Sequence, residues 1–96
     1  MPSAPSQSLF LILGRDNFEK IEAEIKTKYP NDYYQLGDGQ WIIASAGETT
    51  RGVCDQLGIT TARTGNAVVV AFTNYFGRAN KEIWEWMAAK LGAQNA

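Results

Sequence analysis

An uncharged run near the start of the chain, Ser8 to Leu13, constrains the fold most. It reads SLFLIL and has the length of a β-strand. Because five apolar residues follow one another, both faces of this strand must be buried, which is typical of a strand inside a sheet. A second long run, residues 66–75, is rich in valine and also predicts a strand. The sequence therefore predicts a sheet with the first run near its centre.

Between these two runs the pattern changes from helical to strand-like. Over residues 17–29 apolar positions recur every three or four residues, which predicts an amphipathic helix that Pro30 ends. Residues 32–36 and 40–45 are strand-like and are separated by the turn Gly37-Asp38-Gly39. Two short strands around a glycine-rich turn predict a β-hairpin.

Capping signals predict two further helices. Ser45 and Glu48 have the S-x-x-E spacing of a capping box, so a helix is expected from there to about Leu57. Asn80 can cap a last helix that ends before Gly92. The elements then follow the order β-α-β-β-α-β, with one more helix at the end.

This order predicts an α+β fold, a ferredoxin-like βαββαβ sandwich with a four-stranded antiparallel sheet plus a C-terminal helix. We expect the first and third strands to be central and parallel, and the helices to cover one face of the sheet. A single domain, residues 9–92, is expected to follow a disordered arm, residues 1–8, that is rich in Pro, Ser and Ala.

The second face of the predicted sheet is also apolar. In both long strands apolar side chains alternate onto both faces, so the face without helices needs a cover. We favour a second copy over the last helix as that cover, because symmetric pairing is the commonest assembly. A chain of 96 residues also gains considerably from a shared interface. The predicted partner is a second copy, in a homodimer through the open sheet face.

Aromatic residues near the C-terminus are candidate interface residues. Trp84 and Trp86 are two positions apart and must face different sides of the last helix, so one of them is expected at a partner surface. Tyr75 and Phe76 lie at the end of the last predicted strand and can bind stacked bases or a peptide. The favoured alternative is that these two residues anchor the final helix.

Charge and composition exclude several classes of function. The chain has 9 Lys and Arg, 10 Asp and Glu and no His, so it lacks the broad positive field of a dedicated duplex binder. The lone Cys54 rules out an internal disulfide and is interpreted as a core residue, and without histidine no zinc site is expected. No segment approaches the roughly 20 apolar residues of a membrane span, so we expect a cytoplasmic protein without membrane contact.

Three segments resemble a known family. They read YYQLGDGQWII at residues 33–43, TTRGVCDQL at 49–57 and NAVVVAF at 66–72. With them the chain resembles the SinR-type family of small ferredoxin-like proteins, which are similar to the smaller CRISPR spacer-acquisition protein and to related toxin nucleases. The resemblance implies the same fold, but a shared fold does not carry activity.

In these nuclease relatives an acidic residue that closes the first strand is proposed to bind metal, typically directly after a tyrosine. Here the position reads Leu13-Gly14-Arg15-Asp16, so the tyrosine is absent and the acid is displaced. Asp16 also precedes the first predicted helix, with Glu19 three residues on, close to capping-box spacing. We favour a helix cap over a catalytic metal ligand, since one carboxylate makes a poor magnesium site.

The predicted topology brings the starts of the first two helices to one rim of the sandwich. Helix N-termini favour anions. Arg15 lies near one start, and Arg51, Thr49 and Thr50 lie at the other, so these four residues are candidate anion-binding residues. We favour the alternative that both arginines are solvated or pair with Asp16 and Glu48.

Three functions follow from these features. The preferred one is a small dimeric interaction module without catalysis or cofactor, because the sequence shows no histidine and no catalytic site of two paired acids. The second is a metal-dependent nuclease or nucleic-acid-binding protein, with Asp16 holding magnesium and Arg15 and Arg51 holding phosphate. The third is a sensor of a nucleotide or another anion at the two-helix rim.

Overall fold

The computed structural model describes residues 7–91, which form a four-stranded antiparallel sheet and three helices. Residues 1–6 of the predicted arm lie outside the described residues, and Ser8 begins the first strand. The elements are β1 (Ser8–Gly14), α1 (Phe18–Lys28), β2 (Tyr33–Gly37), β3 (Gln40–Ser45), α2 (Thr50–Leu57), β4 (Ala67–Phe72) and α3 (Lys81–Lys90).

The sheet has the strand order β2-β3-β1-β4. The prediction that β1 is central is confirmed, since Leu11 lies opposite Ile42 of β3 on one side and Val70 of β4 on the other. The prediction that β1 and β3 are parallel is wrong, because they pair antiparallel. The chain returns through α1 so that β2 runs in the same direction as β1, and the tight hairpin then reverses β3 against both strands.

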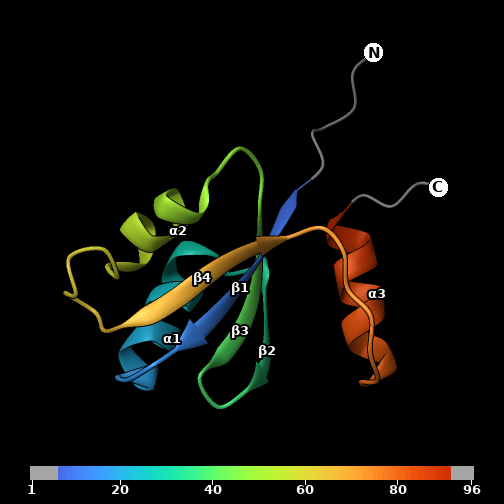
Figure 1. Cartoon of the computed structure of the whole chain (residues 1–96), viewed down its shortest axis with the longest axis horizontal. Helices are drawn as coiled ribbons and strands as arrows, with labels where there is room; N and C mark the ends of the chain where they lie inside the picture. Colours follow the sequence, from blue (N-terminus) through green and yellow to red (C-terminus); the bar gives the residue numbers. More distant parts are fainter. Residues whose placement is uncertain (1–6, 92–96) are drawn as a thin grey trace.

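The larger core lies between the sheet and helices α1 and α2, which cover the same face (Figure 1). This core contains apolar side chains of the sheet, of both helices and of the segments that follow the helices. Full burial of one such side chain stabilises the fold by about 1.5–3 kcal/mol. Cys54 is half-buried against this core, and burial raises the pKa of its thiol. The buried members are Phe10, Ile12, Ile21, Ile25, Tyr29, Trp41, Ile43, Val53, Leu57 and Ile59.

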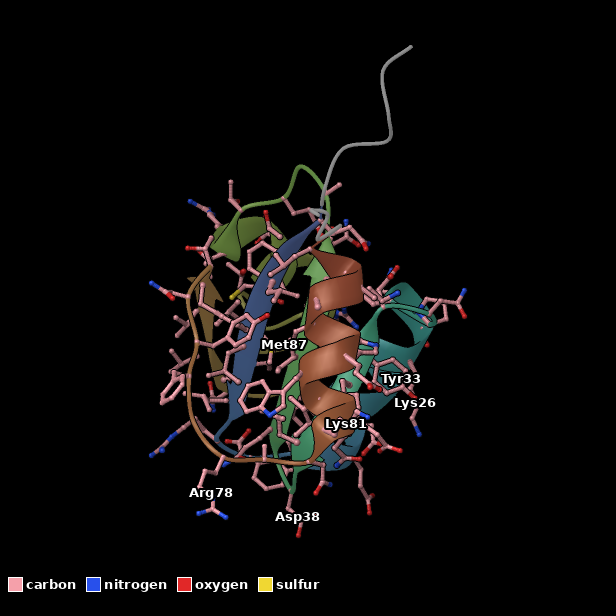
Figure 2. The ribbon with its side chains drawn as sticks, turned by 90° about the vertical axis from the view of Figure 1, so that its right-hand side faces the viewer. Lys26, Tyr33, Asp38, Arg78, Lys81 and Met87 are labelled. Atoms are coloured by element: carbon pink, nitrogen blue, oxygen red, sulfur yellow. The ribbon has the colours of Figure 1, made fainter. Side chains whose placement is uncertain are left out.

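A second, smaller core lies on the opposite face, under α3 (Figures 1 and 2). Met87 of α3 is buried there against Leu9 and Ile42 of the sheet. The end of α3 is fixed by Lys90, whose ammonium group donates to the Asp32 carboxylate at 2.8 Å. The last helix therefore covers part of the face that was expected to be covered by a second copy. In Figure 2 α3 crosses the sheet and leaves β4 beside it uncovered by a helix.

The predicted caps of the first two helices are wrong. Asn17 is the N-cap of α1, in a left-handed conformation with φ 51°, and Asp16 precedes it. The N-cap of α2 is Thr49, whose Oγ1 accepts from the Gly52 N–H at 3.0 Å. Ser45 instead donates to the Glu48 carboxylate at 2.7 Å. The chain is still irregular between these two residues, so their side chains bond to each other and not to helical N–H groups.

Candidate functional site

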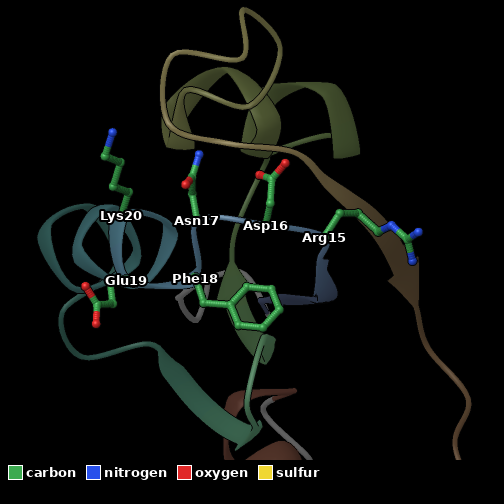
Figure 3. A pocket seen from close by; sticks show the side chains of 6 residues that line it. All are labelled: Arg15, Asp16, Asn17, Phe18, Glu19 and Lys20. Carbon is green, nitrogen blue, oxygen red and sulfur yellow. The ribbon is translucent and has the colours of Figure 1, made fainter.

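A hollow of about 480 Å³ lies where the chain leaves β1, lined by the consecutive residues 15–20 (Figure 3). Asp16, the predicted cap or metal ligand, has both carboxylate oxygens engaged there. Its Oδ1 accepts from the backbone N–H of Asn66, and its Oδ2 accepts from the Asn66 side-chain amide, both at 2.9 Å. These bonds, the backbone one first, hold the Asp16 pKa below its usual value.

The backbone beside this hollow continues the pairing of β1 with β4. The Arg15 N–H donates to the Asn66 carbonyl at 2.8 Å, so Asp16 fastens the point where this pairing ends. A Cβ on Gly65 would come within 3.1 Å of both the Asn17 side chain and Asp16 Oδ1, which explains why this close approach uses glycine. The Arg15 side chain points away from the Asp16 carboxylate in Figure 3.

Within residues 7–91 no group of three or more His, Cys, Asp or Glu side chains is placed to hold a metal ion. Each oxygen of the Asp16 carboxylate accepts one hydrogen bond from Asn66. These two bonds form a structural clamp between two segments that are distant in the sequence.

The predicted anion-binding rim is wrong. Leu13, at the end of β1, lies opposite Gln40, whereas Ser8, at the start of β1, lies opposite Ser45. Helix α1 therefore starts at one end of the sheet, and α2 starts at the other. The antiparallel pairing of β1 with β3 is the physical reason, because the carboxyl ends of antiparallel neighbours point in opposite directions.

The residues of that prediction are accordingly separated. Arg15 lies in the hollow after β1, while Arg51 and Thr50 lie in the first turn of α2. Thr49 uses its hydroxyl oxygen as the helix cap. The two arginines do not form a joint site for one anion.

An apolar groove of about 360 Å³ lies on the other face of the sheet, between α3 and strands β1 and β4. All of its lining residues except Asn74 carry apolar or aromatic side chains. The groove is more apolar than the hollow after β1. The lining residues are Leu11, Leu36, Ile42, Val70, Phe72, Asn74, Tyr75, Ala79, Ile83, Trp84 and Met87.

The predicted interface residues divide between the two sides of α3. Trp84 lines the groove and stacks on Tyr75, with ring centroids 5.8 Å apart and an interplanar angle of 8°. Trp86 packs against Tyr34 on the other side of the helix, at 5.8 Å. The prediction that the two tryptophans face different sides is confirmed. Tyr75 anchors α3, whereas Phe76 is fully exposed.

Two valines of β4 extend the apolar surface beyond the groove. The side chains of Val68 and Val70 lie on the groove face and are 51% and 41% exposed. Alternation along the strand places Val68 and Val70 on the face opposite Val69, but it did not identify them as site residues. Successive side chains of this strand point to opposite faces, but the side chains on both faces are apolar. The sequence therefore does not indicate which face is buried and which is exposed.

None of the helices in residues 7–91 has the length and apolar character that crossing a bilayer requires. Comparison of the chain with models of protein families, with curated proteins and with solved structures found no match. The resemblance to the SinR-type family therefore rests on the three segments quoted above.

Proposed function

We propose that this protein is a non-enzymatic interaction module that works as a homodimer, with a ferredoxin-like fold of the SinR type. The element order β-α-β-β-α-β and the strand order β2-β3-β1-β4 support the ferredoxin-like part of this proposal, because two split βαβ units produce both orders. The three segments quoted above support the family. The apolar surface on the groove face supports the homodimer.

The observation that carries the proposal is the apolar surface formed by the groove together with Val68 and Val70. A contiguous exposed apolar surface marks an interaction site in a small protein. We take a second copy to cover the part of this surface that Val68 and Val70 form, because residues 66–77 include no charged residue. Two copies of this segment can approach each other without repulsion between like charges.

Static light scattering tests the homodimer. At micromolar concentration the wild-type protein is expected to have twice the 10.6 kDa mass of one chain. Val70→Lys places a charge in the apolar surface and is expected to give monomers. Gln56→Lys, the same charge at an exposed position of α2, is the control and should leave the dimer intact. A monomeric wild-type protein would contradict the proposal.

The alternative function is a metal-dependent nuclease, and one observation favours it: Arg15 and Asp16 line the same hollow. The two hydrogen bonds from Asn66 give Asp16 a structural role that requires no metal. Incubation with labelled DNA and RNA, with and without magnesium or manganese, separates the two functions. Metal-dependent cleavage that Asp16→Asn abolishes in a folded protein would favour the nuclease over the interaction module.

A further inference from the structure

Strand β4 is an edge strand without the protection that such strands normally carry. It pairs with β1 on one side over six consecutive residue pairs, and no strand of residues 7–91 pairs with its other side. In Figure 1 β4 lies in front of the sheet with no ribbon before it. Natural edge strands are blocked by charge, proline or bulges. Residues 66–77 contain neither a charged residue nor a proline.

The outward backbone groups of β4 can be assigned from one hydrogen bond. The Arg15 N–H donates to the Asn66 carbonyl at 2.8 Å, so Asn66 directs its carbonyl toward the β1 side, while the neighbouring Gly14 N–H donates to Gly39 on the β3 side. Hydrogen-bonded and non-hydrogen-bonded pairs alternate along an antiparallel ladder. The even-numbered residues of β4 therefore bond to β1. The N–H and C=O groups of Ala67, Val69 and Ala71 point away from the sheet.

We propose that β4 pairs antiparallel with β4 of a second copy, about a twofold axis that passes beside Val69. This inference rests on the homodimer proposed above and specifies its geometry. In this register Val69 faces Val69 of the second copy, and Ala67 faces Ala71. All of these residues direct their backbone groups outward, so about six inter-chain hydrogen bonds form. A shift by one residue would oppose outward groups to groups already bonded to β1.

The side chains support the same register. It places Val68 opposite Val70 of the second copy, at non-hydrogen-bonded positions, where facing side chains are closest. These two residues are the exposed valines of β4, at 51% and 41%. Pairing through the edge thus covers the side chains that the single chain leaves in water, and it brings no charged residue opposite another.

The pairing also has a consequence for the groove. A twofold axis perpendicular to the sheet keeps each face of one copy on the same side as that face of the other. The two four-stranded sheets join into one, and both grooves lie on the same face beside the junction. The homodimer would therefore present a single apolar surface of twice the extent.

Proline substitution at an outward position tests the pairing without breaking the sheet. Ala71→Pro removes an N–H that is not bonded to β1, and proline is tolerated on an edge strand whose N–H faces solvent. We expect a monomeric mass in light scattering with an unchanged circular dichroism spectrum. Ala71→Ser keeps the N–H at the same exposed position and should stay dimeric.

Disulfide trapping tests the register and does not depend on the proline variant. In a Cys54→Ser background, Val68→Cys and Val70→Cys proteins are mixed and oxidised. The register predicts a linked dimer in the mixture. Neither protein alone should link, because each cysteine then lies diagonal to its copy, beyond the roughly 7 Å between Cα atoms that a disulfide spans.

The outcomes distinguish the two proposals. A monomeric wild-type protein would overturn both the homodimer and the edge pairing. A dimer that Ala71→Pro leaves intact, and that shows no preference for the mixed disulfide, would overturn the edge pairing alone. Loss of the dimer in Ala71→Pro together with selective linkage of the mixture would establish the register.

Discussion

Asp16 binds Asn66, which lies 50 residues further along the chain, through both of its carboxylate oxygens at 2.9 Å. One of the two donors is the backbone N–H at the entrance to β4. The acidic residue that the sequence suggested as a helix cap or metal ligand thus joins the end of β1 to the start of the edge strand. Its role in the fold is to fix where β4 begins.

The clamp predicts unequal effects of its two halves. Asp16→Ala loses both hydrogen bonds, whereas Asn66→Ala keeps the backbone bond to Asp16 Oδ1. Asp16→Ala should therefore lower the midpoint of thermal unfolding more than Asn66→Ala. The double variant should unfold at the same temperature as Asp16→Ala, because the amide has no acceptor left. Additive shifts in circular dichroism melts would contradict the clamp.

The ion pair between Lys90 and Asp32 predicts a loss of stability in acid. Hydrogen bonding to Lys90 holds the Asp32 pKa below its usual value. The Asp32 carboxylate of the folded protein therefore binds a proton less readily than that of the unfolded chain. The ion pair stabilises the fold at pH values above 3.8, the ordinary pKa of an aspartate. This stabilisation is lost as the pH falls from there through the lower pKa of the folded state.

Urea unfolding at a series of pH values from about 6 down to about 2.5 measures this effect. The free energy of unfolding of the wild-type protein should fall more steeply on acidification than that of Asp32→Asn, whose side chain does not titrate. Equal slopes would show that the bond between α3 and Asp32 contributes nothing measurable in solution.

Met87 tests whether α3 is an integral part of the fold. Its side chain is 2% exposed and lies in the core between α3 and the sheet. Met87→Ala should reduce the free energy of unfolding by about 2–5 kcal/mol, whereas Met87→Leu should cost less than about 1.5 kcal/mol. An equally small cost for both variants would mean that α3 packs loosely on the sheet. Urea unfolding followed by tryptophan fluorescence reports both values.

Replacement of Gly58, the residue that ends α2, is predicted to reduce stability strongly. It ends α2 with φ 73°, and a Cβ there would collide with the Arg63 guanidinium and the Thr64 hydroxyl. Gly58→Ala should cost more than about 1–2 kcal/mol, the usual penalty for a left-handed residue with a side chain. Gly77→Ala is the control, because a Cβ at Gly77 meets no atom within 4 Å. Equal effects in urea unfolding would contradict this account of Gly58.

Local patterns predicted most of the elements, because each depends on neighbouring residues. The uncharged run ending at Leu13 gave a central strand, and β3 was predicted with its observed bounds, Gln40–Ser45. The direction of β3 relative to β1 was predicted wrongly, although the hairpin before β3 already implies it. That error also produced the false anion-binding rim.

Long-range features could not be predicted in the same way. Nothing near Asp16 in the sequence points to Asn66, since the contact depends on how β1 and β4 pair. The presence of the groove likewise depends on where α3 packs on the sheet. Helix α3 has apolar or aromatic residues on more than one side, including Trp84 and Trp86, so its sequence does not specify which face meets the sheet.

Residue-resolved hydrogen exchange along β4 tests the proposed assembly most directly. In the dimer the N–H groups of Val69 and Ala71 are bonded to the second copy, so they should be protected at high protein concentration and lose protection on dilution. Val68 and Val70 bond to β1 in either state and serve as internal references. Rapid exchange at Val69 and Ala71 at every concentration, beside protected Val68 and Val70, would contradict the pairing of two copies through β4.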